Sequence, residues 1–282
     1  TVPQQPTPIR LQEYGVGIFN SALTKSALKK ALKKRFITVD ETIATTATFI
    51  SGGEVIKLIL PEKTHLKKKL IFPLQVLFED EHLAAIHKPA GILVSGNHFK
   101  TIANALNQNI KISSLSDSAA PQPVHRLDYA TTGILLIGKT SGTIRALNKA
   151  FENKAISKTY YAITIGEMTT KGSIDTEIDG KEALSQYELL YTVPSKRFDK
   201  LNLVRLKPQT GRRHQLRKHL SSIGNPILGD RTYGKEPLIL KGKGLYLHAN
   251  TLDFEQPYTN EKICVEDKLP KRFEKIFPHI DS

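Results

Sequence analysis

Cysteine is almost absent from this chain, since Cys264 is the only one among 282 residues. A single thiol excludes an intrachain disulfide framework and any thiolate-rich zinc site. No apolar run approaches the roughly 20 residues that a membrane-spanning helix needs. The first residues lack the charged segment followed by an apolar stretch that marks a secretory signal. We therefore expect a protein of the reducing cytoplasm that does not enter a membrane.

Acidic residues are also scarce, because 27 Asp and Glu stand against 41 Lys and Arg and leave a formal charge of +14. Such an excess predicts a polyanionic partner. The same charges could serve only to solvate the surface, so charge alone does not decide the function. The length of 282 residues predicts one large domain, or a medium domain beside a small one.

The N-terminal part predicts a short tail followed by a basic helix. Residues 1–9 hold three prolines, which favours a disordered tail or an extended strap. Residues 24–34 have helical spacing, with Thr24 or Ser26 available to cap the helix. The buried face is expected to contain Leu28, Ala31 and Leu32. Lysines cover the rest of the helix, and residues 36–39 and 51–60 indicate strands after it.

A proline-flanked basic segment, residues 61–73, predicts a linker. Beyond it, short strand-like runs dominate: 83–86, 134–137, 161–165, 187–191, 203–206 and 246–254. Many strands with few strong helical segments favour an α+β fold with a mainly antiparallel, mixed sheet decorated by helices. The predicted organisation is a tail (1–9), a small α+β domain (10–60), the linker (61–73) and a large second domain (74–282).

Residues 124–138 place charged side chains directly before an apolar run. Asp128 is thereby held on a tight loop, ahead of Thr131–Gly133 and a buried strand. If the loop is extended, Arg126 and Asp128 project to the same side, where the cation favours the ionised carboxylate. An Asx turn or a loop-anchoring ion pair has the same spacing. Spacing alone leaves catalysis and loop anchoring open.

The segment Gln209–His219 begins with Gln-Thr-Gly and continues with the period of a helix. The buried stripe is expected to contain Leu216, Leu220 and Ile223. Off that stripe we expect Arg213, Arg217 and Lys218. Gly224 is placed to end the helix in a left-handed conformation. His214 and His219 lie five residues apart and have no third ligand nearby in the sequence, so we expect no metal.

The order His125-Arg126-Leu127-Asp128 followed by Thr131-Thr132-Gly133 resembles the signature motif of the RluA-type pseudouridine synthases. The related RsuA-type enzymes usually have Gly at the first position, so the RluA type fits better. Lys158–Ala162 resembles the second motif of that family and Gln209–His219 the third. In all, the resemblance covers residues 74–257, which implies the pseudouridine synthase fold for the second domain.

The resemblance implies a role for each motif. Asp128 is the catalytic residue of the first. Tyr160 stacks on the target base, with Tyr161 as a one-position alternative. Arg217 forms an ion pair with Asp128, and Arg212 is the less favoured candidate for that pair. The implied reaction converts uridine to pseudouridine and consumes nothing, so no cofactor is expected.

RNA is the implied partner, and polar and basic side chains would bind it. The candidates are His125, Arg126, Thr131, Arg212, Arg213, His214, Lys29, Lys30 and Lys33. Residues 10–60 resemble the small αL-type RNA-binding domain named after a ribosomal small-subunit protein, although its lysines could merely solvate the helix.

Such an N-terminal domain resembles the arrangement in enzymes that modify large-subunit ribosomal RNA, which implies that RNA as substrate, with transfer RNA as the alternative. We expect the enzyme to be a monomer. A noncatalytic RNA-binding or ribosome-assembly protein on the same scaffold is a further alternative. A metal-dependent nuclease is disfavoured, because no second carboxylate accompanies Asp128 in its motif.

Overall fold

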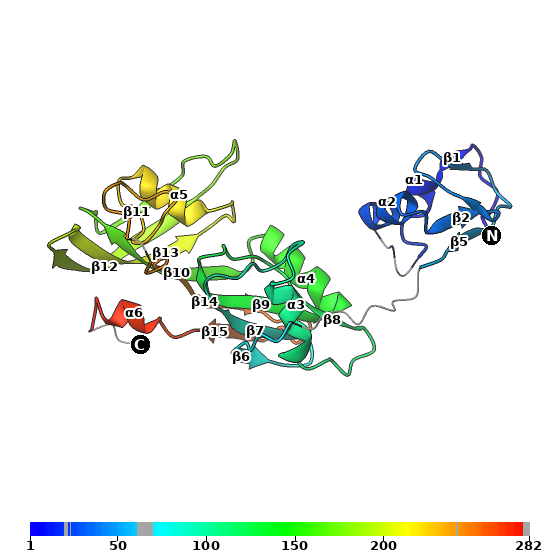
Figure 1. Ribbon diagram of the computed structural model, residues 1–282. Coiled ribbons are helices and arrows are strands. Elements are labelled where there is room, and N and C mark those ends of the chain that lie inside the picture. Colours follow the sequence, from blue (N-terminus) through cyan, green and yellow to red (C-terminus); the bar gives the residue numbers. More distant parts are fainter. Residues whose placement is uncertain (20–21, 23, 61–69, 241, 279–282) are drawn as a thin grey trace. The chain divides into compact units, whose positions relative to one another are not determined.

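A computed structural model describes residues 1–19, 22, 24–60, 70–240 and 242–278. The chain divides into two compact units, Thr1–Lys68 and Lys69–Ser282 (Figure 1). Most of the predicted linker, residues 61–69, lies outside the described residues. Within the described ranges, no helix is both long enough and apolar enough to cross a membrane.

The first unit is built around one amphipathic helix. Its helices are α1 (Leu11–Tyr14) and α2 (Lys25–Lys33), and its strands are β1 (Ile9–Arg10), β2 (Ile37–Val39), β3 (Thr42–Ile43), β4 (Phe49–Ile50) and β5 (Ile56–Leu58). Thr24 caps α2, because its Oγ1 accepts a hydrogen bond from the Ala27 N–H at 3.1 Å. Leu28, Ala31 and Leu32 are buried, so the predicted helical face is confirmed.

Residues 1–9 form an extended strap on the first unit. The Val2 side chain is buried, and its backbone N–H donates to the Glu54 carbonyl at 2.8 Å. Further along, the Gln5 N–H donates to the Ser51 carbonyl at 2.8 Å. β1 then pairs with β4. The strap therefore belongs to the first compact unit and is not a separate tail.

The second unit is a ten-stranded sheet with helices packed on it. Its helices are α3 (Ile102–Ala105), the 3₁₀ turn η1 (Leu106–Gln108), α4 (Ser141–Glu152), α5 (Gln215–Ser222) and α6 (Lys271–Glu274). Its strands are β6 (Val76–Glu79), β7 (Leu83–Lys88), β8 (Ser118–Pro123), β9 (Thr132–Thr140), β10 (Ser157–Ile165), β11 (Lys171–Ile174), β12 (Ser185–Ser195), β13 (Asp199–Pro208), β14 (Leu247–Glu255) and β15 (Lys262–Glu266).

The sheet is mixed but mainly antiparallel. Its strand order is β11-β12-β13-β10-β14-β9-β7-β6, with β15 beside β14 and β8 beside β9. Among the described strands, only the β14–β9 pair is parallel. Helix α4 packs on the β9 half of the sheet and α5 on the β12–β13 half (Figure 1). The predicted α+β class with a mainly antiparallel sheet is confirmed.

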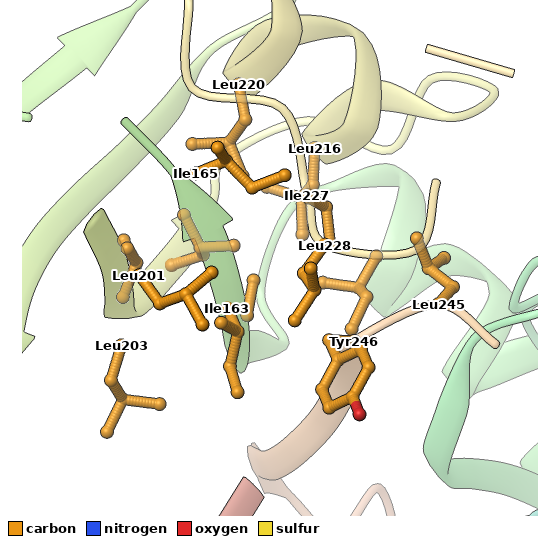
Figure 2. Packing of buried hydrophobic residues seen from close by; sticks show 14 of the residues in the cluster. Ile163, Ile165, Leu201, Leu203, Leu216, Leu220, Ile227, Leu228, Leu245 and Tyr246 are labelled. Atoms are coloured by element: carbon orange, nitrogen blue, oxygen red, sulfur yellow. The ribbon is translucent and has the colours of Figure 1, made fainter. Parts of the chain in front are cut away.

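Apolar side chains of α5 join the larger of the cores in the second unit. Leu216 and Leu220 lie in one cluster with Ile163 and Ile165 of β10 (Figure 2). The prediction that Ile223 would complete the buried stripe is wrong, because its side chain is 40% exposed. Helix α5 ends at Ser222, so Ile223 lies beyond the last turn and leaves the helical period.

The parallel contact between β9 and β14 requires a glycine at the start of β9. Gly133 pairs with Ala249 and has a φ of +115°, a conformation that side chains rarely adopt. A Cβ at this position would collide with the Ala249 carbonyl. Gly133 therefore lets the chain that carries Asp128 enter the centre of the sheet, with β14 alone between it and β10.

Candidate active site

Asp128 begins a tight turn that leads into β9. The Thr131 N–H donates to the Asp128 carbonyl at 3.1 Å. Lys88, at the end of β7, lies under this turn with no exposed surface. Its ammonium donates to the carbonyls of Thr131 at 2.8 Å, Pro89 at 2.9 Å and Tyr129 at 3.4 Å. These three hydrogen bonds hold the turn in place.

The Lys88 ammonium is a cation kept in an apolar interior. Burial lowers its pKa from 10.5 to about 8, and the negative charge of Asp128 acts in the opposite direction. Its carbonyl partners replace the hydration that burial removes. Lys88 thus places a positive charge next to the Asp128 turn. Among the described residues, its ammonium bonds to carbonyl groups and forms no ion pair.

A cavity of about 720 Å³ opens over Asp128. Nine of the residues that the sequence predicted for the site line it: His125, Arg126, Asp128, Thr131, Tyr160, Arg212, Arg213, His214 and Arg217. They come from the loop before β9, from β10 and from the loop and helix after β13. The three predicted lysines, Lys29, Lys30 and Lys33, lie in the first unit.

The charged groups nearest to Asp128 come from the third motif. The Arg217 Nη1 lies 3.5 Å from one carboxylate oxygen, and the His214 Nε2 lies 3.8 Å from the other. Arg126 is exposed and forms no ion pair with Asp128 in the described part of the chain. The pairing of Arg126 with Asp128 that an extended loop suggested is therefore absent, because the backbone turns at Asp128.

Arg217 is buried, with 7% of its surface exposed, so its predicted place off the buried stripe of α5 is wrong. Its Nε and Nη2 donate to the two carboxylate oxygens of Asp230 at 2.7 and 2.8 Å. Burial disfavours the guanidinium, but the hydrogen bonds and charge of Asp230 and the charge of Asp128 outweigh it and raise the Arg217 pKa. The cation is therefore held permanently ionised beside Asp128.

Tyr160 lines the cavity, whereas the adjacent Tyr161 does not. The two side chains leave opposite faces of β10, as successive residues of a strand do. Burial, and then the negative charge of Asp128, raise the pKa of the Tyr160 hydroxyl, so the phenol stays neutral. The geometry thus favours Tyr160 as the aromatic face near Asp128.

The His125 side chain makes its contacts with other residues of the protein. The Leu136 N–H donates to its Nε2 at 2.9 Å, and its ring packs against Phe151 with 4.6 Å between centroids. Burial, and secondarily the charge of Lys158, lower its pKa from 6.5 to about 3. His125 is therefore neutral and ties the loop to β9.

His214 and His219 both bond to other groups of the protein. His214 Nδ1 lies 3.0 Å from the Tyr233 hydroxyl. His219 is bonded through Nδ1 to Ser185 and through Nε2 to the Thr176 carbonyl, both at 2.9 Å.

Three residues of the site were missed by sequence reasoning: Lys88, Asp230 and Tyr233. Arg217 lies over the Tyr233 ring, 5.0 Å from its centroid, so Asp230 and Tyr233 together surround the guanidinium. Asp230 and Tyr233 both lie within residues 74–257, over which the family resemblance extends. The sequence signal that could have identified Asp230 was an acidic residue within the matched range to which no partner had been assigned.

The first unit carries a separate basic surface on α2. A hollow there is lined by Lys25, Ser26, Lys29, Lys30, Lys33 and Lys34. Lys30 and Lys33 are exposed and Lys29 is half-buried. Lys25 is paired with Glu13 at 2.6 Å, which leaves the other lysines as the positive face of this helix. Such a face attracts phosphates.

Comparison with known proteins agrees with this geometry. Residues 82–222 match the family described as RNA pseudouridylate synthase. An uncharacterized RNA pseudouridine synthase of Aquifex aeolicus (strain VF5) is 33% identical, over 92% of this chain and 90% of that protein. The ribosomal large subunit pseudouridine synthase C of Rickettsia prowazekii (strain Madrid E) is 32% identical, over 95% of this chain and 96% of that protein.

Among solved structures, human RNA pseudouridylate synthase domain containing 4 superposes with a TM-score of 0.57 at 27% identity, covering 71% of this chain and 90% of that one. The matches to these curated relatives extend over nearly the whole chain. This chain therefore belongs to the RNA pseudouridylate synthase family and to its RluA type, and is an isomerase that acts on uridines in RNA.

Proposed function

We propose that this isomerase acts on structured large-subunit ribosomal RNA and that Asp128 does the covalent work. The observation that carries the proposal is the half-buried Asp128 carboxylate, which faces a cavity with the Arg217 guanidinium 3.5 Å away. The choice of RNA is supported by the name of the Rickettsia prowazekii relative, a ribosomal large subunit pseudouridine synthase.

The reaction breaks the bond between the ribose carbon C1′ and the base nitrogen N1. The uracil then turns, and C1′ is joined to C5. The proton that leaves C5 is balanced by the proton that N1 gains, so nothing is oxidised or consumed and no cofactor is needed. Asp128 would attack C6 of the base, attack C1′ of the ribose, or remove a ribose proton.

All three routes need an ionised carboxylate in a site with little water. A lone buried charge is costly, and a fixed cation offsets that cost. Arg217 meets this need, because Asp230 orients its Nε and Nη2 and leaves Nη1 directed at Asp128. The same arrangement supports Asp128, rather than another acid, as the reacting group.

A uridine inside folded RNA must leave its stack before it reaches Asp128, which costs a few kcal/mol. Tyr160 would receive the extruded base by stacking, and its neutral phenol presents no charge to the uracil. The exposed Arg126, Arg212 and Arg213 at the mouth of the cavity would bind phosphates, and Thr131 and His214 would position the nucleotide.

The lysines of α2 would provide a second RNA contact, in a domain that spans residues 10–60 together with its N-terminal strap. We further propose that the enzyme acts as a monomer in the cytoplasm. The monomeric state is supported by the cavity, because Asp128, Tyr160 and Arg217 all come from one chain and no residue of a second copy is required.

Two measurements test this function. The Asp128→Asn variant should release no tritium from C5-labelled uridine in RNA while its RNA affinity stays nearly unchanged. Tritium release by that variant would contradict the role of Asp128. Pseudouridine mapping of total RNA with and without the gene should show a lost site in large-subunit ribosomal RNA. A loss in transfer RNA would correct the substrate, and no loss would favour a noncatalytic protein.

A further inference from the structure

The cavity extends well past the Asp128 turn. Its volume of about 720 Å³ is that of a site for a drug-sized ligand, more than one flat pyrimidine ring needs. One part of the lining consists of Asn148, Phe151 and Glu152 of α4 and of Lys154 and Lys158, which follow α4 in the sequence. None of these side chains has a role in the chemistry described above.

Positive groups dominate the lining. The basic side chains are Arg126, Lys154, Lys158, Arg212, Arg213 and Arg217, whereas Asp128 and Glu152 are the two carboxylates. Arg217 is paired with Asp230, and the Arg212 Nε donates to the Glu182 carbonyl. Arg126, Lys154 and Arg213 are exposed and can be solvated freely.

Lys158 differs from all of these. Its side chain is only partly exposed, yet its ammonium has no hydrogen-bond or ion-pair partner in the described residues. Glu152, the carboxylate that α4 contributes to the lining, forms no ion pair with Lys158. Burial lowers the pKa of Lys158, and no nearby anion counteracts that effect. The Lys158 ammonium is therefore an unpaired, water-accessible cation of the cavity lining and is available to an anion that binds there.

We propose that Lys158 binds the RNA phosphate next to the target uridine, and that the α4 side of the cavity is the subsite for that neighbouring nucleotide. The proposal rests on the proposed function, since it takes Tyr160 as the platform for the extruded base.

The position of Lys158 on β10 specifies which phosphate it meets. Lys158 and Tyr160 are two residues apart on β10, with their Cα atoms roughly 7 Å apart, and both side chains line the cavity. A base stacked on Tyr160 therefore keeps its own backbone within reach of the Lys158 side chain. Stacking on an aromatic ring combined with a cation for the backbone is the usual way in which single-stranded nucleic acid is held.

The first test replaces the charge and keeps the aliphatic stem. Lys158→Met should weaken binding of the full-length chain to a transcript containing the mapped uridine by about tenfold. The slope of log K against log salt should become shallower by about 0.7 to 0.9, the contribution of one phosphate contact. Lys262→Met, an exposed lysine on β15 outside the cavity, is the matched control and should change neither value. Equal behaviour of the two variants would overturn the proposal.

The second test changes the RNA instead of the protein. A transcript with one uncharged methylphosphonate linkage beside the target uridine should be converted about tenfold more slowly by the unmodified enzyme. Lys158→Met should convert the charged and the uncharged transcript equally slowly, because the contact is already lost. Losses that multiply at both flanking linkages would exclude Lys158 as the partner of either phosphate.

These experiments separate failure of the subsite from failure of the proposed function. If the unmodified enzyme does not convert the unmodified transcript, the assigned substrate is wrong. If it does so and the Lys158 results are negative, only the subsite is wrong. A structural role for Lys158 predicts a lower melting temperature for Lys158→Met, whereas a binding role predicts an unchanged one, because the ammonium forms no hydrogen bond or ion pair in the described part of the free protein.

Discussion

Arg217 holds Asp230 more closely than it holds Asp128. Its Nε and Nη2 lie 2.7 and 2.8 Å from the Asp230 oxygens, while Nη1 lies 3.5 Å from Asp128. One acid thus orients the guanidinium and leaves a donor for the other. The backbone N–H groups of Thr232 and Tyr233 in turn donate to Asp230 at 2.9 and 3.1 Å, so the orienting acid is itself fixed.

Asp230→Asn should therefore impair both stability and catalysis. Removing one partner of a buried pair leaves an uncompensated charge and costs about 3–5 kcal/mol of unfolding free energy. The kcat should fall at least about tenfold, since a shift of Arg217 disturbs the geometry around Asp128. Urea unfolding and tritium release measure the two effects.

A matched control for this variant is Asp179→Asn. Its carboxylate also accepts from a basic residue of α5, Lys218, at 2.8 Å, but it is exposed. Exposed pairs contribute little, so this variant should unfold and turn over like the unmodified enzyme. Equal effects of the two substitutions would show that Asp230 does not support Arg217.

Lys88→Met should change how stability depends on pH. The Lys88 pKa is about 8 in the folded chain against 10.5 for an ordinary lysine, so between these pH values the unfolded chain binds more protons. The free energy of unfolding therefore gains up to about 1.4 kcal/mol per pH unit from this group across that window. Urea unfolding from pH 7 to 10.5 should show this rise in the unmodified enzyme and a flatter curve in the variant.

The same variant tests whether Lys88 positions the Asp128 turn. Lys88 contacts the Thr131 carbonyl and not the cavity, so its loss should lower kcat while KM for RNA changes little. A rise in KM at constant kcat would instead place Lys88 in RNA binding.

Tyr160→Phe and Tyr160→Ala should behave differently. Phe keeps the ring, and the hydroxyl is neutral in the folded enzyme, so Phe should retain most of the activity. Ala removes the stacking face, which is worth about 1–3 kcal/mol per base, and should lower kcat/KM by about 5- to 150-fold. Tritium release at subsaturating RNA measures this. Equal losses in both variants would show that the hydroxyl, not the ring, is the functional group.

The local parts of the structure could be predicted from the sequence. The spacing of Leu28, Ala31 and Leu32 predicted α2 with its cap, and Gly224 takes the left-handed conformation expected after α5, with a φ of +84°. Short-range periodicity and turn chemistry determine such features. The motif residues around Asp128 and Arg217 could likewise be named, because each motif is continuous in the sequence.

The buried contacts that hold the site residues in place could not be predicted in this way. Arg217 looked like a surface residue of α5, since the partner that makes its burial tolerable, Asp230, lies 13 residues further on in a loop. Lys88 was not singled out, because the Thr131 carbonyl that it binds is 43 residues away in the sequence. Burial of charge depends on such distant partners, which periodicity does not report.

The α2 lysines should contribute phosphate contacts that add to those of the cavity. Replacing Lys29, Lys30 and Lys33 by Gln should keep the fold, since none of them pairs with an acid in the described residues and the buried face of α2 is untouched. RNA affinity should fall, and the slope of log K against log salt should become shallower by about 0.7 to 0.9 for each lysine that meets a phosphate.

Lys57→Gln is the control, because Glu41 already neutralises that lysine on the same unit. The kcat at saturating RNA should stay unchanged, because the described residues that line the cavity around Asp128 belong to the second unit. A fall in kcat with an unchanged salt slope would mean that α2 does not bind phosphates, and that its charges serve only to solvate the helix.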